Sequence, residues 1–173
     1  MFGYITGILK GNKLANASAR ICQDVVNFLV ESGTELQLPN TAYILRESYC
    51  LSSFAMMNPN AGVPHKDALA DQAKAILKDW LIKAFRESST EYHYDDSVEA
   101  VISELDARFV DWAEELHESH PELKGKPIEE WLPAAISKFM IHVGSHIFEQ
   151  HGNEPSNFHT SLYTIATKHL GIG

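Results

Sequence analysis

The sequence predicts an all-α fold, a single-domain bundle of about six helices with an apolar central second helix. Three observations support this. Apolar residues recur every three or four positions through nearly the whole chain, no segment alternates strictly as a half-buried strand does, and Gly or Pro separates the periodic segments. The length of 173 residues fits one helical domain, 1–173, with a sizeable core.

The first two helices differ in how much of their surface is apolar. The first has a single stripe, and Gly33 is a plausible stop for it. The second follows Pro39, where Asn40 or Thr41 can cap it. Its residues 42–58, AYILRESYCLSSFAMMN, are apolar almost all round, so we expect them at the centre of the bundle.

Turn-forming and polar segments delimit the third and fourth helices. The cluster PNAGVP at 59–64 predicts a turn, after which a helix begins near Lys66. The polar segment 87–96 predicts a loop, and Asp96 can cap the helix that follows. Pro121 breaks the chain again.

The last two helices have clear predicted ends. Residues 128–131 predict a short helical turn, and Pro133 suits the first position of the longer fifth helix. Gly152 ends that helix, and Gly171 ends a final helix that carries Phe158.

The N-terminal residues 1–12 form a possible arm. Gly3, Gly7 and Gly11 are four apart, so in a helix they would form a smooth strip that permits close approach of another backbone. Each Gly also costs a helix about 1 kcal/mol relative to Ala. We expect the arm either to cover the core or to dock on a partner or second subunit.

The two cysteines, Cys22 and Cys50, lie in apolar helical patterns outside any CxxC pair. This favours two reduced, buried thiols in a cytoplasmic protein, although a disulfide between them stays open. The glycines and late charges of the N-terminus do not fit a secretory signal, and no apolar run approaches the roughly 20 residues of a membrane span.

The formal net charge of −9 is concentrated in one segment. Residues 87–122 hold twelve acidic residues and one base, Arg108. No run of Lys or Arg occurs anywhere, which argues against direct nucleic-acid binding. Four acidic residues project on one line opposite the apolar stripe, which predicts either a solvated helix face or a docking face for a protein with a basic surface: Glu104, Asp111, Glu115 and Glu118.

The stretch FMIHVGSHIFEQHG has the spacing of a possible metal site. His142 and His146 are four apart, so their imidazoles can share one divalent ion, and Glu149 lies a turn beyond. Helical projection puts all three at the edge of the core. A metal ion or haem would need another ligand from a different helix, and the alternative is an ordinary polar edge of a core helix.

No motif of a known catalytic class occurs, neither GxSxG nor a P-loop nor GxGxxG. The sequence therefore favours a small acidic binding module, regulatory or adaptor in role and possibly a homodimer. One alternative is a metal- or haem-binding bundle. A further alternative is a small-molecule sensor or enzyme with a pocket lined by the second helix, in which Arg46 and Glu47 must find partners if buried.

Overall fold

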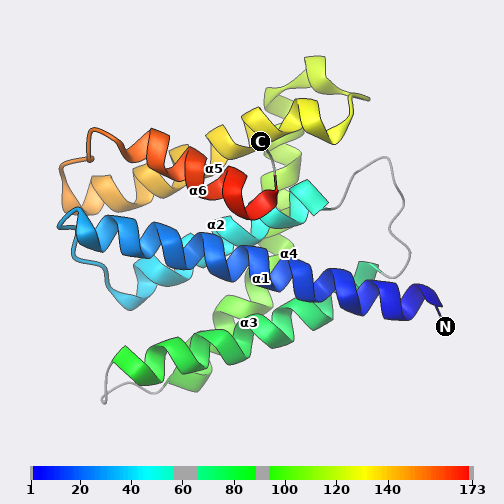
Figure 1. Cartoon of the computed structure of the whole chain (residues 1–173), viewed down its shortest axis with the longest axis horizontal. Coiled ribbons are helices and arrows are strands. Elements are labelled where there is room, and N and C mark those ends of the chain that lie inside the picture. The colour runs from blue at the N-terminus through cyan, green and yellow to red at the C-terminus, as the bar shows by residue number, and fades with distance from the viewer. Residues whose placement is uncertain (1, 57–65, 89–93, 172–173) are drawn as a thin grey trace.

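The computed structural model describes residues 2–56, 66–88 and 94–171, and within these ranges it contains helices joined by turns and loops, with no strand (Figure 1). The predicted all-α fold is confirmed. The elements are α1 (Phe2–Glu31), α2 (Leu38–Met56), α3 (Lys66–Ser88), α4 (Tyr94–Ser119), the 3₁₀ turn η1 (Pro121–Leu123), α5 (Ile128–His151) and α6 (Phe158–Leu170). The predicted turn at 59–64 and residues 89–93 of the predicted loop lie outside the described residues.

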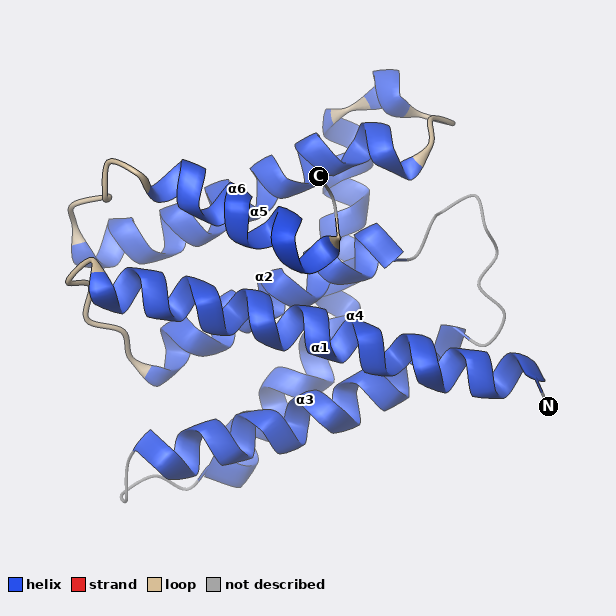
Figure 2. Ribbon diagram, in the orientation of Figure 1, coloured by secondary structure: helices blue, strands red, loops and turns tan. Residues whose placement is uncertain are grey.

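The helix α2 lies at the centre of the bundle, as predicted. It contacts α1, α4 and α5, whereas α3 packs on α1 and α4, and α6 packs on α1 and α5. In Figures 1 and 2, α4 crosses behind the other helices at a steep angle to the long axis of the molecule. This crossing lets α4 contact α3, α2 and α5 in succession.

The central position of α2 follows from its apolar surface. Ile44, Leu45 and Leu51 are completely inaccessible to solvent, and Phe54 is almost so. Burial of one such side chain contributes about 1.5–3 kcal/mol. The buried polar groups of α2 are satisfied in part locally, since the Ser48 hydroxyl donates to the carbonyl oxygen of Ile44 at 2.7 Å.

The two cysteines are free and buried, and no disulfide joins them. Burial raises the pKa of both the Cys22 and the Cys50 thiols, so both stay protonated. None of the described helices combines the length and the apolar character that crossing a membrane requires.

Helix ends agree with the predicted glycines, and one helix start differs. The three helices α1, α5 and α6 end just before Gly33, Gly152 and Gly171, all at positive φ. Pro133, however, lies inside α5, which already begins at Ile128. The first turn of α5 is held because Trp131 is buried in the core, where the centroid of its ring lies 5.8 Å from the centroid of the Phe54 ring.

Residues 2–12, assigned to a possible arm, are the first turns of α1. Within them, Gly11 packs directly against α3. A β-carbon at this position would lie 2.8 Å from the backbone oxygen of Leu69 and 2.9 Å from the β-carbon of Gln72. The absence of a side chain therefore sets the distance between the two helices.

The close contact at Gly11 predicts the effect of adding one methyl group. Gly11→Ala gains about 1 kcal/mol of helix propensity. The close contact with backbone puts the cost of overpacking near the upper end of about 1–3 kcal/mol, so we expect a net loss of about 1–2 kcal/mol in the free energy of unfolding. Urea denaturation measures it. Asn16→Ala, at an exposed position of the same helix, should leave stability equal or higher; a Gly11→Ala protein as stable as the parent would contradict the tight contact.

Candidate functional site

The acidic helix α4 is held in the bundle by ion pairs to three other helices. On α3, Lys78 and Lys74 lie 2.5 Å from Glu99 and 2.6 Å from Asp106. Further along α4, the carboxylates meet bases of α2 and α5. These contacts are Arg46 to Glu104 at 2.8 Å and Lys138 to Glu115 at 2.5 Å. Much of the acidity of this segment is therefore neutralised inside the protein.

The four residues of the predicted docking face fall into two groups. Glu104 and Glu115 form the ion pairs with Arg46 and Lys138. Asp111 and Glu118 are exposed, and no ion pair to either is found in the described part of the chain. Glu114, which the projection did not select, is exposed in the same way. We call Asp111, Glu114 and Glu118 the acidic edge.

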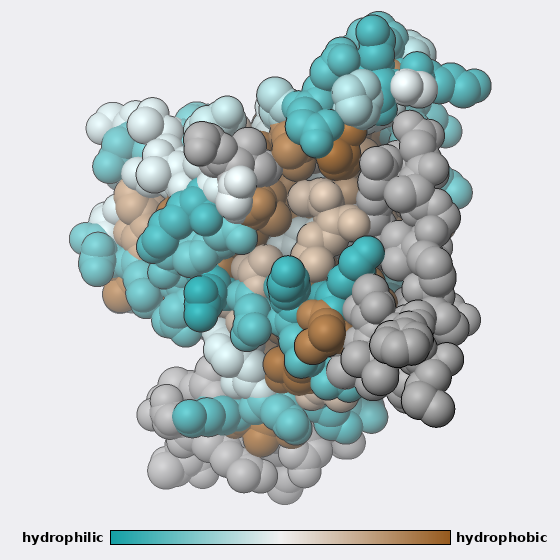
Figure 3. Space-filling view, turned by 45° about the vertical axis from the view of Figure 1, so that its right-hand side comes forward, coloured by the Kyte–Doolittle hydropathy of each residue, from teal (hydrophilic) through white to brown (hydrophobic). Residues whose placement is uncertain are grey.

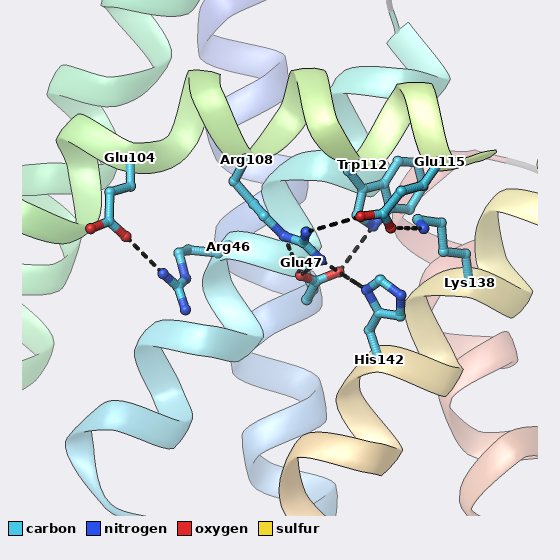
Figure 4. A network of polar contacts seen from close by, with 8 residues as sticks. All are labelled: Arg46, Glu47, Glu104, Arg108, Trp112, Glu115, Lys138 and His142. Atoms are coloured by element: carbon cyan, nitrogen blue, oxygen red, sulfur yellow. Dashed lines mark hydrogen bonds and ion pairs between the residues drawn. The ribbon is translucent and has the colours of Figure 1, made fainter. Parts of the chain in front are cut away.

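A buried carboxylate joins α2, α4 and α5 beside these surface pairs (Figure 4). The side chain of Glu47 is fully inaccessible. Its Oε1 accepts from Nε and Nη2 of Arg108 at 3.0 and 2.9 Å, and its Oε2 accepts from the indole N–H of Trp112 at 2.9 Å. Nδ1 of His142 lies 3.2 Å from the same Oε2.

Opposing effects act on the ionisation of Glu47. Burial by itself raises the pKa of its carboxyl, but the hydrogen bond to His142 and the positive charge of Arg108 outweigh burial, and the net pKa lies below its ordinary value. Glu47 is therefore a carboxylate at neutral pH. The predicted requirement that a buried Glu47 find a charged partner is met by Arg108, the one base of the segment 87–122.

The ring of His142 lies between a donor and an acceptor. Its Nδ1 is 2.9 Å from Nη2 of Arg108 as well as 3.2 Å from Glu47. With a proton on Nδ1 the ring donates to Glu47, and without one it accepts from Arg108. Either state of Nδ1 thus has one partner inside the cluster.

The possible metal ligands His142, His146 and Glu149 point to different partners. The His146 ring stacks on Tyr43 at 3.8 Å between ring centroids, and its Nε2 lies 3.5 Å from Nδ2 of Asn40. Glu149 is exposed. Among the residues that the structure describes, no three His, Cys, Asp or Glu side chains are placed to hold an ion. The two histidines lie at the edge of the core, where the helical projection puts them.

A groove of about 220 Å³ opens between α4 and α5, next to the buried cluster. Its walls combine apolar side chains with polar ones: Leu116 and Ser119 from α4, His120 directly after α4, and Ala134, Ser137, Lys138, Ile141 and His142 from α5. Ile141 is 55% exposed, which is unusual for an isoleucine beside a core helix. The groove can therefore accept one apolar side chain.

Neither a family model, nor a curated protein, nor a solved structure matches this chain.

Replacing Arg108, which binds the buried Glu47, should cost more stability than replacing Arg46, which binds Glu104 at the surface. Arg108→Met leaves a buried carboxylate without its cation, so we expect a loss of about 2–3 kcal/mol in the free energy of unfolding. Arg46→Met removes the pair to the exposed Glu104 and the contact of the guanidinium with the Tyr43 ring, and leaves no buried charge, so it should cost about 1 kcal/mol. Urea denaturation of both variants tests this, and equal losses would contradict the role of Arg108.

The lowered pKa of Glu47 predicts a pH dependence of stability. A carboxyl whose folded pKa is lowered contributes stability that is complete above its unfolded pKa and is lost as the pH falls through the folded pKa. The unfolding free energy should therefore fall below about pH 4.5, the ordinary pKa of Glu. Glu47→Gln should start less stable and fall less steeply, while the exposed-site control Glu114→Gln should follow the parent curve. If the free energy of unfolding of Glu47→Gln fell with pH as steeply as that of the parent protein, this prediction would be refuted.

Proposed function

We propose that this protein is a binding module whose docking surface is the acidic edge of α4 together with the groove between α4 and α5. The observation that carries the proposal is that Asp111, Glu114 and Glu118 stay exposed, outside the ion pairs formed by Glu99, Glu104, Asp106 and Glu115 of the same helix. If the carboxylates of α4 served only to form ion pairs within the protein, Asp111, Glu114 and Glu118 would not be needed.

The geometry of the groove supports a partner of defined chemistry. By helical count Asp111 and Glu118 lie about 40° and 60° around α4 from Glu115, whose partner Lys138 lines the groove. Ser119, which lines the groove, lies about 40° from Glu115 in the opposite direction, so Glu115 stands between the acidic edge and an opening that contains Ile141. An amphipathic segment with basic residues on one face and an apolar side chain directed into the groove complements both features.

The expected partner is thus another protein, and the expected role is regulatory or adaptor, exerted through binding. The charged contacts would set the association rate and its salt dependence, and the apolar contact in the groove would set the lifetime of the complex. A homodimer formed through another face would leave this docking surface accessible to the partner. Light scattering would give the subunit count.

A peptide with alternating Leu and Lys at helical spacing is a suitable probe. We expect the parent protein to bind it, with an affinity that falls as salt is added. Reversing two charges of the acidic edge, in Asp111→Lys/Glu118→Lys, should weaken binding by at least about tenfold, since each rim charge changes from attraction to repulsion. Fluorescence anisotropy with a labelled peptide measures the affinity.

The matched control reverses two exposed acids elsewhere, Glu31→Lys/Glu35→Lys, with the same change in net charge. It should change the affinity by less than about threefold, because distant charges are screened. Equal losses in the two double variants would mean that only net charge matters and would refute the proposed surface.

A further inference from the structure

A pocket of about 390 Å³ opens where the C-terminal ends of α2 and α6 meet α1. Figure 1 shows both helix ends close to the part of α1 that extends toward the N-terminus. The volume lies in the range of small-molecule sites, roughly 300–1,000 Å³. The pocket lies on different elements from the groove between α4 and α5 and is independent of the function proposed above.

The charge of this pocket is opposite to that of the protein. The chain carries a formal net charge of −9, yet the ionisable residues that line the pocket are all basic: Lys13, Arg20, Lys168 and His169. No Asp or Glu is among its lining residues. Bases gathered in a hollow create a local positive potential, which raises the local concentration of anions.

Two of the four bases form no ion pair with the described residues. Lys13 and Arg20 are exposed, and neither has an ion-pair partner within residues 2–56, 66–88 and 94–171. Lys74, Arg108 and Lys138, by contrast, all bind carboxylates. Because Lys13 and Arg20 are seven residues apart, they lie on one face of α1, about 10 Å apart along its axis.

The other two bases are held beside the pocket by Asp24. Its Oδ2 lies 2.6 Å from Nε2 of His169 and 3.4 Å from Nζ of Lys168. The Lys168 side chain is 67% exposed, so this pair is weak and the amine can reorient. Asp24 thus offsets part of the charge contributed by α6, and Lys13 and Arg20 supply the uncompensated positive charge.

The remaining walls of the pocket are largely apolar. They come from all three helices, with Asn16 as the one polar residue among Ala17, Ala55, Met56 and Leu170 in the described lining. Methionine adapts its shape to different ligands because its side chain is unbranched and flexible. Figure 3 shows apolar surface exposed between hydrophilic side chains over the middle of the face it presents.

We propose that this pocket binds a small organic anion, with its anionic head group on Lys13 and Arg20 and its apolar part against Ala17, Ala55, Met56 and Leu170. The guanidinium of Arg20 can bind two oxygens of a carboxylate or phosphate at once, and Lys13 adds a second cation. The small residues Ala17 and Ala55 leave room for the apolar part.

A structural role for the same bases makes a different prediction. The C-terminal ends of α2 and α6 carry partial negative charge on their last carbonyl groups, and nearby cations stabilise them by about 0.3–1 kcal/mol each. If the bases served only this purpose, removing them would lower the melting temperature and the pocket would bind no ligand.

Calorimetric titration with two probes, octyl phosphate and octanoate, tests the proposal at concentrations below those that form micelles. We expect at least one to bind, and to bind more tightly than inorganic phosphate, which lacks the chain, and octanol, which lacks the charge. The tighter of the two identifies the head group. The variant Lys13→Gln/Arg20→Gln should weaken this binding by at least about tenfold.

The matched control is Lys124→Gln/Lys126→Gln, which removes two exposed positive charges from the segment before α5. Its affinity should stay within about threefold of the parent. Both double variants alter exposed side chains, and circular dichroism verifies that they fold. Absence of binding by either probe, equal binding of octanol, or equal losses in the two double variants would overturn the proposal.

Discussion

The carboxylate of Glu47, buried in the central helix, is the constraint on which the packing of α2, α4 and α5 depends. Its charge is stable in the core only because Arg108 and Trp112 of α4 and His142 of α5 surround it. Such a buried pair adds little net stability compared with apolar packing, but an unpartnered charge is costly. Arrangements of α4 in which Arg108 does not reach Glu47 are therefore disfavoured.

The surface charges of α4, like the buried pair of Glu47 and Arg108, help to fix how this helix packs on its neighbours. Acids of α4 meet bases of α3, α2 and α5 in turn, at Lys78, Lys74, Arg46 and Lys138. Each exposed pair contributes less than about 1 kcal/mol. Together they favour one orientation of α4. This helix crosses the others steeply, so the packing of side-chain ridges into the grooves of neighbouring helices contributes less to fixing its orientation. The acidic segment is thus first a structural feature of the bundle.

The charges left over from these pairs are not mixed evenly over the surface. Unpaired carboxylates remain on the outer side of α4, beside a groove, and unpaired bases remain around the pocket between α1, α2 and α6. A protein that needed charge only for solubility would gain from interspersed signs. The separation of signs is what motivates two proposed sites for ligands of opposite charge.

Local patterns along the chain were enough to predict the helices, most of their ends and the central place of α2. Helical periodicity, a helix-ending glycine such as Gly171 and the nearly all-round apolar surface of residues 42–58 depend on neighbours a few positions away, so local chemistry fixes them. A helical turn at 128–131 was predicted, but not that it continues through Pro133 as part of α5, because that turn is held by burial of Trp131 against another helix. The packing of the helices, in contrast, determines that Glu104 and Glu115 form internal ion pairs and that Arg108 and His142 contact Glu47. It also brings Lys13, Arg20 and Lys168 to one pocket. These contacts join residues far apart in the chain, and they depend on the angles at which the helices cross, which helical periodicity does not encode.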